Sequence, residues 1–222
     1  MTSSRLPGKG LRMVQGNKLF DYVLETLRNT ASVSEIVFAT SQDHTDDEIE
    51  SYASSVGLAC VRGSLQDVTE RFGTALGYCE SEAAFRVNGD SPMISRRLFD
   101  QAASAFETTG ADIVTNVFPR SYPPGVSVEL IRKSAFDRVV MEQSTEDDRE
   151  HVTRFIYSNP DMFRIHNLES AENFAHCHLA VDTPRDLQVF EGMVKRMTRP
   201  HWEYAPKELV MLHHQVSESL DG

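Results

Sequence analysis

Apolar residues recur along this chain at two spacings, one typical of amphipathic helices and the other of short buried strands. Residues 17–29 place apolar side chains three or four positions apart, which predicts a helix with one buried face. The next apolar run, EIVFAT at residues 35–40, is short and β-branched, and it predicts a strand buried on both faces. The runs at residues 58–63 and 83–90 predict two further strands, the latter ending in a polar turn.

Helical patterns alternate with strands through the rest of the chain. Helices are predicted at residues 45–57, 65–81 and 95–110, with strands at 111–118, at the start of 127–143 and late in 149–168. The proline-rich stretch 119–126 is predicted to be irregular. A final strand, a turn at residues 182–184 and a last core helix are predicted within 176–197.

This alternation predicts an α/β fold with a mostly parallel sheet and helices on both faces. The expected domain spans residues 1–197, and residues 198–222 form a partly helical C-terminal tail.

Composition narrows the class of protein. The 222 residues carry a net charge of −11, which disfavours nucleic-acid and membrane partners because both surfaces are anionic. No apolar run approaches the ~20 residues that span a bilayer. Three widely spaced cysteines, Cys60, Cys79 and Cys177, give neither a disulfide framework nor a metal-ligand pair, so a cytoplasmic location is expected.

Two aspartates follow predicted strands at matching places. Asp90 ends FRVNGD, Asp182 ends HLAVD, and a proline follows each within two residues. Ligands of such sheets bind beyond the carboxyl ends of the strands, and paired carboxylates there suit Mg²⁺. The alternative is that each aspartate is the N-cap of the helix after it.

The opening stretch MTSSRLPGKG concentrates groups that bind polyanions. Ser3, Ser4 and Gly8 offer hydroxyl and backbone donors, while Arg5 and Lys9 offer positive charge. The spacing is not that of a Walker loop. A disordered tail with solvated charges is the competing interpretation.

The histidines are interpreted as structural. His151 near a helix start resembles a hydrogen-bonding residue more than an acid or base. His176, Cys177 and His178 stand close together, but no second cluster with ligand spacing completes a zinc site. His213 and His214 in the tail are treated in the same way.

Several motifs together resemble one family. MTSSRLPGK, RGSLQDVTERF, VNGDSPMI, TNVFPRSYPPGVSVEL, REHVTRFIY and LAVDTPRDL occur in the order found in cytidylyltransferases of the spore-coat polysaccharide type. That family is similar to the synthetases of CMP-activated acidic sugars such as CMP-sialate and CMP-3-deoxy-manno-octulosonate. The resemblance extends from residue 1 to about residue 192.

The resemblance implies a Rossmann-like nucleotidyltransferase, usually a homodimer, that uses CTP and Mg²⁺. Such an enzyme transfers CMP to an acidic sugar or similar anionic acceptor for surface-glycan synthesis and releases pyrophosphate.

The family's roles extend to matching residues of this chain. Arg5 and Lys9 would bind the triphosphate, Lys9 would stabilise the leaving pyrophosphate, and Asp90 and Asp182 would hold the metal. Arg62 and Arg71 would shape the nucleotide end of the pocket. The residues expected to face the acceptor are Arg120, Tyr122, Glu129, Arg149 and His151, and the arginines suit a carboxylate or phosphate on the sugar.

The family's phosphate loop follows a central apolar strand, and here Met1 falls where the family has a methionine inside that loop. Loss of a central strand would leave a cleft and unpaired backbone groups on both neighbours. The expectation is that this start is internal to a longer gene product.

A second departure lies in YPPGVSVEL, where Pro124 and Ser127 replace carboxylates usual in the family, although Glu129 remains. This departure widens the range of possible acceptors. It also favours an alternative, a non-catalytic nucleotide-binding or scaffolding relative. A nucleotide-sugar glycosyltransferase is a third possibility, although NGDSP lacks that class's Asp-x-Asp stretch.

Overall fold

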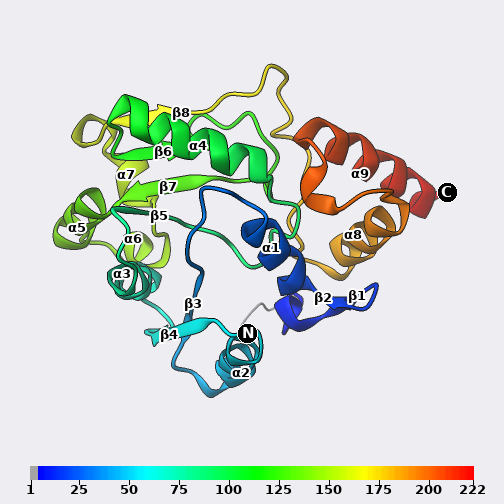
Figure 1. Cartoon of the computed structure of the whole chain (residues 1–222), viewed down its shortest axis with the longest axis horizontal. Helices are drawn as coiled ribbons and strands as arrows, with labels where there is room; N and C mark the ends of the chain where they lie inside the picture. Colours follow the sequence, from blue (N-terminus) through cyan, green and yellow to red (C-terminus); the bar gives the residue numbers. More distant parts are fainter. Residues whose placement is uncertain (1–4) are drawn as a thin grey trace.

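The computed structural model describes residues 5–222, and its strands form three small sheets flanked by helices (Figure 1). The strands are β1 (Met13–Val14), β2 (Asn17–Lys18), β3 (Val37–Ser41), β4 (Ala59–Gly63), β5 (Ala83–Phe85), β6 (Ile113–Thr115), β7 (Glu129–Arg132) and β8 (Ile165–Asn167). The α-helices are α1 (Leu19–Arg28), α2 (Asp47–Ser55), α3 (Val68–Tyr78), α4 (Arg96–Thr109), α5 (Lys133–Glu142), α6 (Glu146–Glu150), α7 (Arg154–Ser158), α8 (Pro184–Arg196) and α9 (Pro206–Asp221). Short 3-10 turns are η1 (Lys9–Leu11), η2 (His44–Asp46), η3 (Pro160–Met162) and η4 (His201–Glu203).

The sheets combine parallel and antiparallel pairs. Strands β3 and β4 are parallel, as are β6 and β8. The four-stranded sheet has the order β5-β7-β6-β8, and β7 is antiparallel to both of its neighbours. The predicted α/β fold is therefore confirmed, while the reversal at β7 and the small β1–β2 hairpin were not predicted from the sequence.

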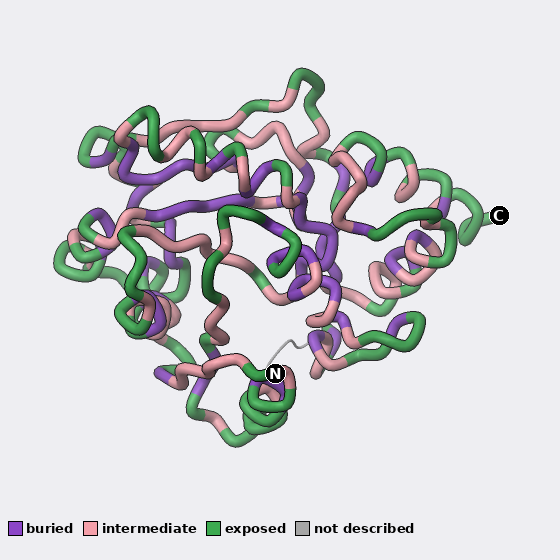
Figure 2. Tube along the Cα trace, viewed as in Figure 1, coloured by how far each residue is buried: buried purple, intermediate pink, exposed green. Residues whose placement is uncertain are grey.

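The core lies on both sides of the four-stranded sheet. The larger cluster joins α1, α4, α8 and α9 through residues such as Leu19, Phe99 and Leu209. The smaller one packs α3, α5 and α7 against the other side and includes Phe136 and Ile156. Burial is densest along β6 and β7 (Figure 2).

Strand β3 is more open than the sequence predicts. The run 35–40 was expected to be buried on both faces, but Val37 and Phe38 are half-buried and Ala39 is exposed. The trace of β3 is accordingly pink and green in Figure 2. The reason is that β3 pairs with β4 on one side and borders an apolar cavity on the other.

The C-terminal segment packs on the core of the preceding residues. Helix α9 lies against α8, and its Leu209 and Val216 belong to the larger core cluster. His201 of η4 is buried, and its Nε2 lies 2.8 Å from the carbonyl oxygen of Tyr22 and 3.0 Å from Oγ1 of Thr26, both in α1. The division at residue 197 stays a prediction.

Candidate active site at the carboxyl edge of the sheet

Lys9 brings the two predicted metal-binding aspartates together. Its Nζ lies 2.7 Å from Oδ2 of Asp90 and 2.9 Å from Oδ1 of Asp182, although these residues are separated by 81 and 173 positions from Lys9. Arg5 approaches the same cluster, with its Nη2 3.7 Å from Oδ2 of Asp182. The fold therefore assembles four of the predicted site residues at one place.

A tight turn positions Lys9. Gly8 has φ 66°, a left-handed conformation that glycine adopts without steric cost, and η1 begins at the next residue. Leu6 is buried in the larger core cluster and anchors the turn from the other side. The side chain of Arg5 is 65% exposed, whereas that of Lys9 is 19% exposed, so Lys9 is the more enclosed of the two cations.

The turns that carry the two aspartates are joined by a backbone hydrogen bond. The N–H of Val181 donates to the carbonyl oxygen of Asp90 at 2.8 Å. The strand predicted before Asp182 is absent, since residues 176–182 form turns and irregular backbone. That prediction was wrong because the apolar residues Leu179 and Val181 are buried in the core without joining a sheet.

Neither aspartate caps a helix, so the competing interpretation is wrong. The N-cap of α8 is Thr183, whose hydroxyl accepts from the N–H of Asp186 while the Asp186 carboxylate accepts from the N–H of Thr183. The N-cap of α4 is Ser95. The carboxylates of Asp90 and Asp182 are thus available to cations.

The pKa values of the cluster follow from these contacts. Partial burial disfavours the charged form of Lys9, but its hydrogen bonds to Asp90 and Asp182 outweigh burial and raise the ammonium pKa above its usual value. Burial likewise disfavours the Asp182 carboxylate, yet the contacts with Lys9, Arg5 and His178 lower its pKa. His178 contributes through its Nε2, 3.2 Å from Oδ2 of Asp182.

The donor set fits Mg²⁺. Oxygens of Asp90 and Asp182 converge on one point, which the cation of Lys9 occupies, and carboxylate oxygens are the ligands that Mg²⁺ prefers. These two residues would hold the ion, and Lys9 would have to release them for it.

A second polar cluster surrounds Glu129 of β7. This carboxylate is buried, and it accepts from Nη1 of Arg86 at 2.7 Å and from the hydroxyl of Tyr157 at 2.7 Å. The Tyr157 hydroxyl also lies 2.9 Å from Oγ1 of Thr115. Burial and the charge of Glu129 raise the Tyr157 pKa, so the phenol stays protonated and donates.

The proline-rich loop lies beside this cluster. Arg120 donates to Oγ of Ser127 at 3.1 Å, and burial lowers the pKa of Arg120 while the charge of Glu129 opposes that shift. Tyr122 is half-buried and packs against the larger core cluster, where burial raises its pKa. Serine at position 127 thus leaves Arg120 with a neutral partner.

The same loop contacts the segment before Asp182. Gly125 has φ 97°, and a Cβ at this position would lie 2.3 Å from the nitrogen of Ala180. The N–H of Leu179 donates to the carbonyl of Pro124 at 2.7 Å. Glycine is therefore required at position 125. The contact joins the loop expected to face the acceptor to the segment that leads to the expected metal ligand Asp182.

Arg71 and Arg62 differ in their surroundings. Arg71 of α3 borders a cavity of about 340 Å³ that Arg86 and Asp90 also line, which suits an anionic ligand. Arg62 of β4 instead forms ion pairs with Asp47 at 2.7 Å and Glu50 at 2.8 Å, and it donates to the carbonyl of Ser41. These partners hold the Arg62 guanidinium on α2 and the β3 terminus, and a nucleotide contact of Arg62 stays a prediction.

The remaining predicted residues are not drawn into the Lys9 cluster. Arg149 and His151 lie exposed at the end of α6, and no contact within residues 5–222 joins them to Asp90 or Asp182. Ser3 and Ser4 lie outside the described residues.

Sequence reasoning missed Arg86 and Tyr157, and it interpreted His178 as structural. Arg86 follows β5 by one residue and Tyr157 lies in REHVTRFIY, so both stood inside motifs that had been noted for other residues. Their side chains meet Glu129 across 43 and 28 positions, and only tertiary structure reveals such contacts.

An α/β fold with parallel and antiparallel strand pairs, and with carboxylates and cations gathered after β5, defines a nucleotidyltransferase-type architecture, and comparison with known proteins supports this class. A profile of the family described as "Cytidylyltransferase" matches residues 1–209, and the chain belongs to this family. The resemblance inferred from the motifs is therefore confirmed.

Sequence relatives lie in the same group. The chain is 29% identical over 220 residues to the spore coat polysaccharide biosynthesis protein SpsF of Bacillus subtilis, with 96% of this chain and 90% of that protein aligned. It is 30% identical over 106 residues to 8-amino-3,8-dideoxy-manno-octulosonate cytidylyltransferase of Shewanella piezotolerans, with 47% and 43% aligned.

Solved structures share the fold. A cytidylyltransferase from Leptospira borgpetersenii matches with a TM-score of 0.88 at 21% identity, covering 100% of this chain and 92% of that one. The CMP:2-keto-3-deoxy-manno-octonic acid synthetase complexed with CTP matches with a TM-score of 0.67 at 16% identity, covering 87% and 94%. Within residues 5–222, no helix is both long and apolar enough to cross a bilayer.

Proposed function

We propose that this protein is a Mg²⁺-dependent cytidylyltransferase that transfers CMP from CTP to an acidic sugar and releases pyrophosphate. The observation that carries the proposal is the contact of Lys9 with both Asp90 and Asp182, at 2.7 Å and 2.9 Å. Family membership and relatives named for CMP transfer to octulosonate sugars support it.

In this proposal the side chains of Arg5 and Lys9 neutralise negative charge on the phosphates. Arg5 and Lys9 leave the carboxylates to bind the triphosphate, and Lys9 stabilises negative charge on the departing pyrophosphate. Asp90 and Asp182 hold a metal ion, which supplies positive charge to the phosphate oxygens when bound. The acceptor oxygen forms a bond to the α-phosphorus as the bond to pyrophosphate breaks, and the hydroxyl proton is released.

In the proposal, different arginines contact different parts of the substrates. Arg71 and Arg86 border the cavity beside Asp90, where they would contact anionic parts of the substrates. Arg120 donates to the neutral hydroxyl of Ser127, so its charge would be available to pair with the carboxylate of the sugar. Arg149 and His151, both exposed, are kept as acceptor contacts in the proposal.

The first test is calorimetric titration of CTP with and without Mg²⁺, on the native chain and on Asp90→Asn. We expect metal-dependent binding that the variant loses. Asp161→Asn, which changes an exposed aspartate of η3, is the matched control and should bind as the native chain does. Metal-independent binding, or equal binding by Asp90→Asn, would contradict the assignment of Asp90.

The second test separates turnover from binding. Pyrophosphate release should require an acidic sugar and should not occur with a neutral sugar of the same size. The replacements at Pro124 and Ser127 favour the alternative of a non-catalytic nucleotide-binding relative. That alternative predicts CTP binding without pyrophosphate release for any acidic acceptor. The expected homodimer is part of the same proposal, and mass measurement in solution tests it.

A further inference from the structure

Side chains typical of zinc sites meet between helix α9 and the segment that leads to Asp182. Sγ of Cys177 lies 3.7 Å from Nδ1 of His213, and ligand atoms of Cys177, His213 and His214 all lie within 4.8 Å of one another. Cys177 and His213 are 36 positions apart in the sequence. The fold therefore supplies the histidines that sequence spacing did not place beside Cys177.

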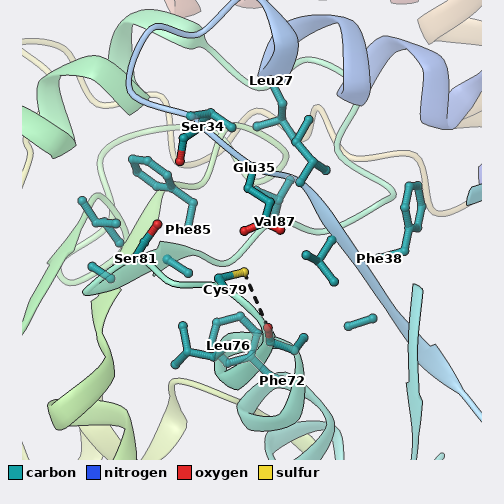
Figure 3. Close-up of a pocket in the computed structure, with 18 of the residues that line it drawn as sticks. Leu27, Ser34, Glu35, Phe38, Phe72, Leu76, Cys79, Ser81, Phe85 and Val87 are labelled. Atoms are coloured by element: carbon teal, nitrogen blue, oxygen red, sulfur yellow. Dashed lines mark hydrogen bonds between the residues drawn. The ribbon is translucent and has the colours of Figure 1, made fainter. Parts of the chain in front are cut away.

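The other two cysteines have different surroundings. Sγ of Cys79 lies 3.6 Å from the carbonyl oxygen of Ala75, and both Cys79 and Leu76 line an apolar cavity (Figure 3). Cys60 belongs to β4 and is half-buried. Within residues 5–222, neither Cys60 nor Cys79 belongs to a group of three potential metal ligands, so the histidine neighbours distinguish Cys177 from both.

The Cys177 thiol is held in place by the protein itself. Cys177 is 4% exposed and belongs to the larger core cluster, and its N–H donates to the carbonyl of Phe174 at 3.0 Å. The chain that follows is fixed as well, since the N–H of Leu179 donates to the carbonyl of Pro124 at 2.7 Å. A ligand that is fixed in advance loses little further conformational freedom when an ion binds.

Helix α9 positions the two histidines. It packs against α8, where Val216 of α9 lies over Gly192, and its Leu209 is buried in the larger core cluster (Figure 1). His213 is half-buried and His214 is exposed, and their ring centroids lie 5.9 Å apart. The His213 ring is therefore held close to Cys177, whereas the exposed His214 ring can turn.

The distances suit a tetrahedral ion. Zinc bonds of about 2.3 Å to sulfur and about 2.0 Å to nitrogen place two such ligands roughly 3.5 Å apart at a tetrahedral angle. The distance of 3.7 Å between Cys177 and His213 is already close to that value. His214, whose ligand atom lies within 4.8 Å of the other two, reaches the same separation by rotation of an exposed side chain.

One thiolate and two imidazoles form a soft donor set. Sulfur and nitrogen ligands select Zn²⁺ over Mg²⁺, whereas the carboxylates of Asp90 and Asp182 suit Mg²⁺. Cys177 is buried and His214 is exposed, so a fourth coordination position opens towards solvent and suits a water molecule.

We propose that Cys177, His213 and His214 bind Zn²⁺ through the cysteine sulfur and one nitrogen of each imidazole, with water as the fourth ligand. The thiol loses its proton to solvent as the zinc–sulfur bond forms, and no electron is transferred. The ion fastens α9 to the segment that leads to Asp182. Its ligands are not those of the proposed cytidylyl transfer, so the zinc site is independent of that activity.

A bound ion would stabilise the part of the chain that carries Asp182. Val181, whose N–H donates to the carbonyl of Asp90 at 2.8 Å, lies between Cys177 and Asp182. Zinc at Cys177 would therefore restrain the same stretch of backbone that joins the turns of the two aspartates. Because the three ligands come together only in the folded chain, Zn²⁺ should raise its melting temperature.

Calorimetric titration of the full chain with Zn²⁺ in excess Mg²⁺ tests the site. Cys177→Ala, His213→Gln and His214→Gln should each weaken Zn²⁺ binding at least ~10-fold and remove the rise in melting temperature. The matched controls are Cys79→Ala and His44→Gln, whose histidine side chain is 89% exposed, and both should bind Zn²⁺ as the native chain does. Because His214 is exposed, His214→Gln leaves the core intact and decides the question even where Cys177→Ala unfolds.

Asp90→Asn separates the zinc site from the carboxylate pair. This variant should bind Zn²⁺ with the affinity of the native chain, although it is expected to lose Mg²⁺-dependent CTP binding. Failure of the proposed transferase and failure of the zinc site therefore give different results.

Binding of Co²⁺ gives a second readout, because a thiolate ligand adds a near-ultraviolet charge-transfer absorption to the spectrum of that ion. The native chain, Cys79→Ala and His44→Gln should show this absorption, and Cys177→Ala should not. Equal Zn²⁺ affinity in the native chain and His214→Gln, or a Co²⁺ complex without the absorption, would overturn the proposal. The contact between Cys177 and His213 would then be a hydrogen bond between thiol and imidazole.

Discussion

The backbone N–H of Val181 donates to the carbonyl of Asp90 at 2.8 Å and so joins two turns that are far apart in the sequence. One turn follows β5 and the other precedes α8. Because the bond involves main-chain atoms, it sets the separation of the two backbone turns from which the Asp90 and Asp182 side chains extend. Lys9 then fits between them.

Replacing Lys9 tests the competition between its ammonium group and a metal ion. Lys9→Met removes the cation that occupies the convergence point of Asp90 and Asp182. We expect Mg²⁺ to bind about 10-fold more tightly in the absence of nucleotide, whereas CTP binding weakens about 10- to 100-fold through loss of a charge-assisted hydrogen bond. Calorimetric titration of each ligand measures both effects. Parallel losses of Mg²⁺ and CTP binding would contradict the competition.

Gly125 provides a test of backbone strain. Gly125→Ala should destabilise the fold by about 2–4 kcal/mol, because φ is 97° and the new Cβ would meet Ala180 at 2.3 Å. Gly57→Ala is the matched control, since Gly57 also has a positive φ, 73°, but open space around it. The control should cost only about 1 kcal/mol. Urea unfolding measures both values, and equal costs would show that the contact with residues 179–180 is unimportant.

Arg86 should be important for stability because it pairs a buried charge. Arg86→Met leaves the Glu129 carboxylate, 4% exposed, with the Tyr157 hydroxyl as its remaining donor among the described side chains. We expect a loss of about 3–5 kcal/mol in the free energy of unfolding, as for other broken buried pairs. Arg164→Met removes an exposed partner of Asp112 and should cost less than about 1 kcal/mol. Similar losses for both variants would place Glu129 in a more solvated environment than the structure shows.

His201 makes stability depend on acidity. Burial lowers the His201 pKa to about 4, while the hydrogen bond to Tyr22 opposes that shift, and the unfolded value is about 6.5. The unfolded chain therefore binds the proton first, so the contribution of neutral His201 is complete above pH 6.5 and is lost as pH falls towards 4. The loss amounts to about 2–3 kcal/mol. Urea unfolding between pH 4 and 7 measures it, and His201→Gln should flatten that part of the profile. An unchanged slope in the variant would contradict this assignment.

Local patterns predicted most of the helices and the members of the Lys9 cluster. The apolar spacing of residues 17–29 marks α1, and Asp90 and Asp182 stand where polar turns interrupt apolar runs. Residues 178–182 show where such reasoning fails. Their apolar side chains are buried as those of a strand would be, but their backbone pairs with a turn and forms no strand.

The Glu129 cluster was only partly predictable. Glu129 was recognised within its motif, whereas Arg86 and Tyr157 were not, because the antiparallel direction of β7 decides which residues face its carboxylate. Arg62 has close acidic partners that its motif did not predict, and its nucleotide contact stays a prediction. Its motif suggested a ligand role, but the acidic first turn of α2 lies beside it and satisfies its charge.

The formal charges of the four residues in contact, Arg5, Lys9, Asp90 and Asp182, sum to zero. A polyanion that binds the two cations leaves the two carboxylates without those ion-pair partners. A metal ion that binds the carboxylates likewise leaves the two cations without them. Each ligand alone therefore breaks ion pairs that only the other can replace. Their binding should be thermodynamically coupled, with each raising the affinity for the other by the same factor.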